Sequence, residues 1–68
     1  MKFSYNEIVK AISNAANAAN EAFLSKDRQQ IVNAYVHLNN LAGICREHGY
    51  FFRAREAHDM ADDLSYHL

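Results

Sequence analysis

The first third of the chain carries apolar side chains at spacings of three and four residues. Such positions share one face of a helix of about five turns. They are Ile8, Ile12, Ala15, Ala19 and then Ala22 or Phe23. Ser4-Tyr5-Asn6-Glu7 forms a capping box, and Phe3 can staple onto Ile8 across the first turn. The pattern predicts a helix that begins at Ser4 and ends near Ser25-Lys26.

Alanine and asparagine fill most of the remaining positions of this first helix. The asparagines Asn14, Asn17 and Asn20 are poor helix formers, so packing rather than propensity must hold the segment. A stripe of small side chains lets another helix approach closely; it consists of Ala11, Ala15, Ala18 and Ala22. We therefore expect Ala15 and Ala18 to lie in a close helix contact, where bulky replacements would overpack.

A second helix is predicted from about Arg28 to His48. Asp27 can cap this helix, and Gln30 lies three residues on, which repeats the capping-box arrangement. Gly49 supplies a left-handed stop, and the basic side chains of the last turn suit the helix dipole. The apolar stripe of this helix is Ile31, Ala34 or Tyr35, Leu38, Leu41 or Ala42, and Cys45.

A third helix follows from about Phe51. Its main apolar line is predicted to be Phe51, Ala54, His58, Ala61 and Leu68, with Ala57, Met60 and Leu64 beside it. The connections between the helices are too short for anything but antiparallel neighbours. The sequence therefore predicts an all-α fold, a three-helix up-down-up bundle that forms one domain over residues 1–68.

The length and the cysteine content bear on stability. A chain of 68 residues buries only roughly 60% of its unfolded surface. The single cysteine cannot form an internal disulfide, and no zinc-type cysteine spacing supplies a staple. Association would relieve the thin stability margin, and a two-fold dimer is the commonest form. We therefore expect a homodimer.

Cysteine use, hydropathy and charge indicate where the protein works. A lone cysteine fits a reducing, cytoplasmic compartment. No stretch approaches the ~18 apolar residues of a membrane span, and residues 1–7 lack the apolar core of a signal peptide. We therefore expect a cytoplasmic protein without membrane contact or a cleaved leader. A net charge of -1 gives no general attraction to a polyanion, so we do not expect nucleic acid as the main partner.

The last two predicted helices carry a spacing that is typical of a repeat family. It runs Leu38-x2-Leu41-Ala42-x2-Cys45-x3-Gly49-x-Phe51-x2-Ala54-x3-His58-x2-Ala61. Over Tyr35 to Leu68 this pattern resembles one degenerate tetratricopeptide repeat. Four residues are the same as in the family pattern: Leu41, Gly49, Ala54 and Ala61. Four others are of a similar type: Leu38, Ala42, Cys45 and Phe51.

The resemblance has limits and implications. His58 stands where the family has an aromatic or aliphatic residue, and residues 1–34 match the pattern poorly. A tetratricopeptide-like hairpin would bind a peptide on the inner face of its first helix. The resemblance implies that this face consists of Val36, Asn39, Asn40, Gly43 and Arg46.

Few residues suggest chemistry. His58 and Asp62 are four apart on one helix face and could both reach a metal ion, but no His-x3-His pair or cysteine accompanies them. Cys45 lies on the apolar stripe of the second helix, which favours a role in filling the core over a role as nucleophile. The serines occupy caps or polar faces, outside any nucleophile-elbow pattern. We predict no catalytic residue, no metal and no cofactor.

Charge is unevenly placed along the third helix. Acidic side chains crowd its second half, where the helix dipole disfavours them, and arginines gather near Gly49. The acidic residues are Glu56, Asp59, Asp62 and Asp63, and the basic ones Arg46, Arg53 and Arg55. Acidic residues at an unfavourable helix end can mark a surface that binds a basic partner. The alternative is that these residues form an acidic face exposed only to solvent.

These features together favour a non-enzymatic protein–protein interaction module, a small dimeric adaptor or regulator of the kind found among phages and other mobile elements. The predicted partner-binding residues are Val36, Asn39, Asn40, Arg46, Glu56, Asp59, Asp62 and Asp63. The alternative is a nucleic-acid-associated regulator that uses the arginines near Gly49. A helical hydrolase or metal-dependent enzyme lacks the paired groups that it would need.

Overall fold

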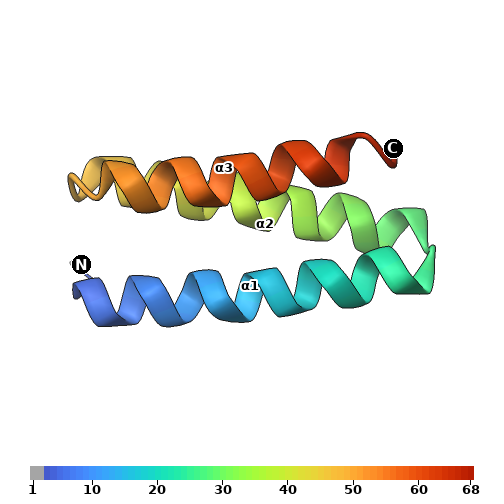
Figure 1. The fold of residues 1–68 in the computed structure, drawn as a ribbon, viewed down its shortest axis with the longest axis horizontal. Helices are drawn as coiled ribbons and strands as arrows, with labels where there is room; N and C mark the ends of the chain where they lie inside the picture. The colour runs from blue at the N-terminus through green and yellow to red at the C-terminus, as the bar shows by residue number, and fades with distance from the viewer. Residues whose placement is uncertain (1–2) are drawn as a thin grey trace.

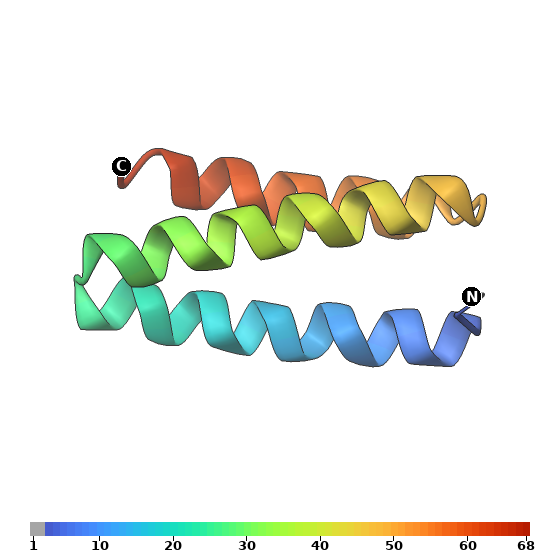
Figure 2. The same ribbon diagram turned by 180° about the vertical axis from the view of Figure 1, so that it is seen from behind.

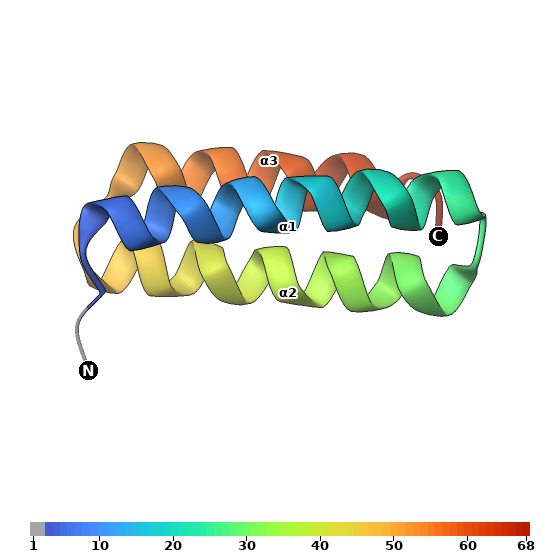
Figure 3. The ribbon, with the colours of Figure 1, turned by 90° about the horizontal axis from the view of Figure 1, so that it is seen from below.

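The computed structural model describes residues 3–68, which form three α-helices (Figure 1). They are α1 (Tyr5–Ser25), α2 (Arg28–Glu47) and α3 (Phe51–Ser65). α1 and α3 run in the same direction and α2 runs back between them, as both faces of the bundle show (Figures 1 and 2). The prediction of an all-α up-down-up bundle is confirmed. Figure 3, a side view, shows α2 beneath α1 and α3.

Local capping chemistry sets the helix boundaries. Ser4 caps α1 with the predicted box: the Glu7 N–H donates to Ser4 Oγ at 3.2 Å, and the Ser4 N–H donates to the Glu7 carboxylate at 3.0 Å. The hydrogen bonds from the Ser4 backbone and side chain hold the pKa of Glu7 below its usual value. Asp27 caps α2 as predicted, but it accepts from the Gln29 N–H instead of pairing with Gln30. One hydrogen bond, from the Gln29 N–H to the Asp27 carboxylate, therefore caps the start of α2.

The two turns take left-handed conformations. Lys26 has a φ of 58° after α1, and Gly49 has a φ of 79° between α2 and α3. The Tyr50 N–H then donates to the Cys45 carbonyl at 2.8 Å, which closes the end of α2. Gly49 is therefore the stop that the sequence predicted, because only glycine takes this conformation without cost.

The buried face of α1 is the predicted one. Its side chains are at most 8% exposed and comprise Ile8, Ile12, Ala15, Ala19 and Ala22. Ala18, however, is exposed, so the prediction that it lies in a close helix contact is wrong. Ala18 lies three residues after Ala15 and therefore falls outside the buried face of α1 on which Ile8 and Ile12 lie.

The buried face of α2 also matches its prediction and comprises Ile31, Leu38, Leu41, Ala42 and Cys45. On α3 the prediction needs a correction. The buried side chains there are Ala54, Ala57, Ala61 and Leu64. Phe51 is 69% exposed, His58 is exposed, and Leu68 lies beyond the helix end at 40% exposure. Small alanine side chains allow α3 to lie close to α2, so this helix turns its alanines and Leu64 inward and Phe51 and His58 outward.

The three helices are not equally close to one another. α2 packs along both neighbours, whereas α1 and α3 approach each other at fewer positions. We call the α2–α3 contact the closed seam; its side chains are at most 3% exposed and comprise Leu38, Ala42, Cys45, Ala54, Ala57 and Ala61. No helix within residues 3–68 has both the length and the apolar character needed to cross a bilayer.

Candidate functional site

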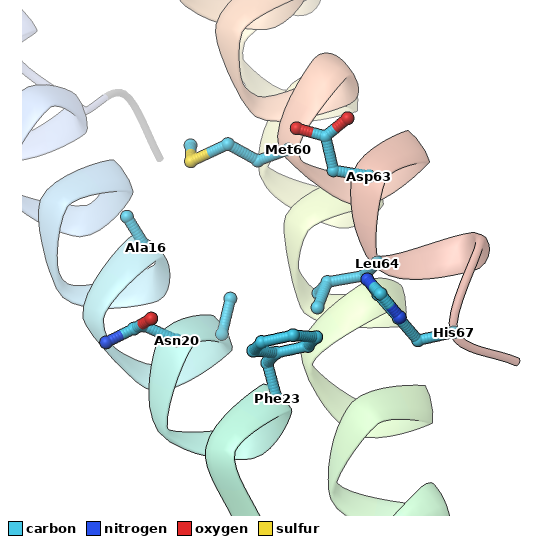
Figure 4. Close-up of a pocket in the computed structure, with 8 residues that line it drawn as sticks. Ala16, Asn20, Phe23, Met60, Asp63, Leu64 and His67 are labelled. Atoms are coloured by element: carbon cyan, nitrogen blue, oxygen red, sulfur yellow. The ribbon is translucent and has the colours of Figure 1, made fainter. Parts of the chain in front are cut away.

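A continuous groove runs between α1 and α3. One hollow is lined by Val9, Ile12, Ser13, Ala16, Arg53, Glu56 and Met60. A second is lined by Ala16, Ala19, Asn20, Phe23, Met60, Asp63, Leu64 and His67 (Figure 4). Because Ala16 and Met60 line both hollows, the two join end to end. We call this feature the α1–α3 groove.

Three pairs of side chains follow one another along the groove. Val9 and Arg53 line the first hollow, Ala16 and Met60 line both hollows, and Phe23 meets His67 at the far end. Val9, Ala16 and Phe23 on α1 and Arg53 and Met60 on α3 are spaced by seven residues, which brings them to one face of each helix, and His67 follows in the turn after α3. In Figure 4 the Met60 side chain reaches from α3 toward Ala16, and the Phe23 ring lies beside His67.

The floor and the rims of the groove differ in polarity. Ile12, Ala19 and Leu64 are buried at the floor. The α1 rim carries the neutral polar side chains of Ser13 and Asn20, and the α3 rim carries the carboxylates of Glu56 and Asp63. The groove therefore offers apolar contact along its centre, hydrogen-bond donors on one rim and negative charge on the other.

An aromatic and charged cluster ties α1 to α3 at the end near Gly49. The Arg53 Nε–H donates to the Tyr5 hydroxyl at 2.9 Å, and the guanidinium carbon lies 5.5 Å from the centroid of the Tyr5 ring. Arg53 also forms an ion pair with Glu56 at 3.0 Å. The bond to Tyr5, followed by that to Glu56, raises the pKa of Arg53 above its usual value. The Tyr5 ring meets Tyr50 edge-on at 5.4 Å between centroids.

A histidine completes this end of the bundle. His48 Nε2 accepts from the Phe3 N–H at 3.0 Å, while Nδ1 lies 2.8 Å from the Ile44 carbonyl. The neutral ring with a proton on Nδ1 satisfies both contacts. The Phe3 ring packs near His48, with 6.0 Å between centroids. The start of α1 is thus fixed to the end of α2.

The opposite end of the groove is apolar and exposed. The rings of Phe23 and His67 lie 4.6 Å apart between centroids, and Phe23 is 42% exposed. A further hollow continues from this pair and is lined by Phe23, Leu24, Lys26, Ile31 and His67. The groove therefore opens toward the turn between α1 and α2.

The structure places the residues predicted on the second helix away from the groove. Val36, Asn40 and Arg46 are exposed on the outer side of α2, and Asn39 is half-buried. A Cβ added at Gly43 would meet no atom within 4 Å, so this glycine does not admit α1, which we had weighed as one explanation for it. These residues line a solvent-facing surface rather than a hollow shared with α1.

The predicted acidic residues fall into two groups. Glu56 and Asp63 border the groove, whereas Asp59 and Asp62 are exposed beside Arg55 and His58. Arg55 Nε lies 3.9 Å from the Asp59 carboxylate, and His58 Nε2 lies 3.9 Å from that of Asp62. Arg55 therefore lies one turn from Asp59, His58 lies one turn from Asp62, and Arg53 forms an ion pair with Glu56.

The candidates for chemistry are dispersed. Cys45 is fully buried, and burial raises the pKa of its thiol, although the charge of Arg53 acts in the opposite direction. Within residues 3–68 no group of three or more His, Cys, Asp or Glu side chains is arranged to hold a metal ion. Cys45 thus fills core space between α2 and α3.

Comparison of the chain with protein-family models, with curated proteins and with solved structures gave no match. Four residues that line the groove, Val9, Ala16, Met60 and His67, were not among the predicted site residues. The signal that could have found them is the spacing of seven residues in Val9, Ala16, Phe23 and again in Arg53, Met60, His67.

Proposed function

We propose that this chain is a non-enzymatic protein-interaction module whose α1–α3 groove binds an amphipathic helix. The observation that carries the proposal is the continuity of the groove through Ala16 and Met60, with buried apolar side chains at its floor. Helix-in-groove recognition uses a surface of this kind, with apolar anchors at helical spacing. A fourth helix in the groove would complete a four-helix arrangement.

The shape of the groove favours a helix over a small molecule. Val9 and Phe23 are fourteen residues apart on α1, which corresponds to a length of about 21 Å. Each hollow has a volume of about 320–340 Å³, at the lower limit of typical ligand pockets. A long, shallow surface of this kind suits a row of side chains from a helix.

The role of a small adaptor or regulator follows from this proposal. A chain with one groove and no further domain within residues 3–68 can act by joining or covering another protein. The tetratricopeptide resemblance would add the outer side of α2, with Val36, Asn40 and Arg46, as a second surface. The nucleic-acid alternative has less support, because Arg53 and Arg55 lie beside Glu56 and Asp59.

A matched pair of substitutions on α1 tests the proposal. Ala16 lines the groove, and Ala18, two residues away, is exposed outside it. Ala16→Arg should block the groove, and Ala18→Arg places the same charge on the same helix without blocking it. Tagged wild-type and variant chains would be used for affinity capture from a nuclease-treated lysate of the source cells, followed by mass spectrometry.

We expect proteins that are captured by the wild type and by Ala18→Arg to be lost with Ala16→Arg. Circular dichroism would verify that both variants keep their helix content. Identical capture by all three folded chains would remove the groove from consideration as a docking surface. Retention on DNA that falls steeply with salt and depends on Arg53 and Arg55 would favour the nucleic-acid alternative.

A further inference from the structure

The two walls of the α1–α3 groove are chemically unlike and complementary to each other. The α1 rim is neutral and carries the hydroxyl of Ser13 and the amide of Asn20, which both donate hydrogen bonds. The α3 rim carries the carboxylate of Asp63 and the ion pair of Glu56 with Arg53, and both carboxylates accept hydrogen bonds. A surface with both walls can therefore match a second copy of itself.

We propose that the α1–α3 groove is covered by the same groove of a second copy, so that α1 and α3 of the two chains pack together around a two-fold axis that runs along the groove. This inference rests on the proposed function, since it names the partner for the same groove. Such an axis places α1 of each copy on α3 of the other, with both helices running in the same direction. The two grooves then close over each other.

The three pairs along the groove fit this arrangement. Val9 and Arg53 line one hollow, Ala16 and Met60 line both hollows, and the Phe23 and His67 rings lie together at the far end, so the three pairs follow one another along the groove. An axis parallel to the helices keeps positions along the groove unchanged, so Met60 of each copy meets Ala16 of the other. A flexible methionine against a small alanine packs well, because the methionine side chain adapts to the space that the alanine leaves.

Electrostatics select this axis over the alternative that crosses the groove. An axis across the groove would set α3 against α3 in opposite directions, and Glu56 of one copy would then lie beside Asp63 of the other. Like charges directly opposite each other are destabilising. With the axis along the groove, Glu56 faces Ser13 and Asp63 faces Asn20 of the other copy, so each carboxylate meets a donor.

The length of the groove suits a two-fold contact. The groove runs along most of the longest dimension of the molecule, which is 33 Å. A two-fold contact between two such faces uses the same residues twice.

Sedimentation equilibrium on the purified chain tests the partner. We expect the wild type and Ala18→Arg to sediment as dimers at micromolar concentration, and Ala16→Arg to sediment as a folded monomer. A monomeric wild type at all concentrations up to about 100 μM would overturn the second copy as the partner. A folded Ala16→Arg dimer would place the contact elsewhere and would also overturn the inference.

Cysteine cross-linking tests the axis and does not depend on the arginine variant. Reduced Ala16→Cys and Met60→Cys chains would be mixed, allowed to exchange, and oxidised, and the products would be separated by mass. We expect the mixed dimer to be the main product. Ala18→Cys in place of Ala16→Cys should give none. Cys45 can stay, because it is buried.

The outcomes separate this inference from the function on which it rests. Covalent dimers of Ala16→Cys with itself would contradict the axis along the groove, and the absence of any cross-linked dimer would contradict the pairing of copies. The proposed function survives a monomeric wild type if Ala16→Arg still abolishes capture of another protein. If Ala16→Arg changes neither self-association nor capture, both proposals fail.

Discussion

The closed seam and the α1–α3 groove lie on two sides of the same helix, yet one is sealed and the other is open. In the closed seam, alanines of α3 meet Leu38, Ala42 and Cys45 of α2, and each of these side chains is at most 3% exposed. In the groove, bulky pairs stand at both ends, Tyr5 with Arg53 and Phe23 with His67. Ala16 and Met60 lie between these ends and line both hollows.

This comparison shows how side-chain size can decide whether two neighbouring helices form a core or a surface. Alanines along one side of a whole seam let the helices touch. In the groove, large pairs at both ends hold the helices apart, and the small Ala16 between them leaves space. The groove is therefore a consequence of where the large side chains are placed and does not require a shortage of apolar residues.

The largest difference in stability is expected between two variants that each lose one large side chain, one from the closed seam and one from the groove. Leu38→Ala should destabilise the fold by about 2–5 kcal/mol, because it leaves a cavity in a fully packed seam. Met60→Ala should cost well under half as much, since Met60 is half-buried beside space that is already open. Urea denaturation of both variants, below the concentration at which the chain associates, gives the two values. Equal losses would mean that the two seams are packed alike.

A second pair of substitutions tests the edge of the buried face of α1. Ala15→Leu should cost roughly 1–3 kcal/mol, because Ala15 is 3% exposed and its surroundings cannot expand. Ala18→Leu should change the free energy of unfolding by no more than about 0.5 kcal/mol, because Ala18 is exposed. Thermal melts of both variants provide the check. A clear loss in Ala18→Leu would show that this side of α1 is covered.

The two glycines should respond to alanine in opposite directions. Gly49→Ala should destabilise by about 1–2 kcal/mol, because a φ of 79° is strained for any residue with a Cβ. Gly43→Ala should stabilise by about 1 kcal/mol, because the added methyl group meets nothing and alanine favours the helix. Chemical denaturation measures both. A loss of stability in Gly43→Ala would show that the outer side of α2 is in contact with something that the isolated chain does not contain.

The smallest effect on folding is expected for the acidic residues of α3. Replacing Asp59, Asp62 and Asp63 together by asparagine should alter the free energy of unfolding by at most about 0.5 kcal/mol. Exposed pairs such as Arg55 with Asp59 are worth little, and relief of repulsion acts in the opposite direction.

The three aspartates should differ in their effect on self-association, although none of them has a large effect on the stability of the fold. Asp63→Asn, at the groove, should weaken self-association, whereas the double replacement of Asp59 and Asp62 should leave it unchanged. Sedimentation at two salt concentrations provides the comparison. If the double replacement has the stronger effect, the exposed acidic face rather than the groove is the binding surface.

Most of the fold was predictable from the sequence because its signals are local. The capping box at Ser4, the cap at Asp27 and the left-handed Gly49 each act within a few residues, and they set the helix boundaries. The buried faces of α1 and α2 followed from spacings of three and four. α3 was harder, since Phe51 and His58 share the spacing of Ala54 and Ala61 but point outward.

The groove could not be predicted to the same degree. Its existence depends on the distance between α1 and α3, and that distance is set by contacts such as Tyr5 with Arg53, forty-eight residues apart. Periodicity alone shows that Val9, Ala16 and Phe23 share a face. It does not show whether that face meets another helix of the same chain or remains open. The sequence therefore indicated the charged and amide-rich surfaces as the sites of partner binding instead.

The central claim, that the α1–α3 groove is covered when the protein associates, is tested most directly at Met60. Its sulfur lies in the middle of the groove and is oxidised by hydrogen peroxide at a rate that depends on access. Mass spectrometry would measure this rate for the diluted chain and for the chain in its assembly, with Ala16→Arg at both concentrations as the control. The account predicts that Met60 is oxidised several-fold more slowly in the assembly and that Ala16→Arg shows no such protection. Equal rates in the diluted and the assembled wild type would contradict it.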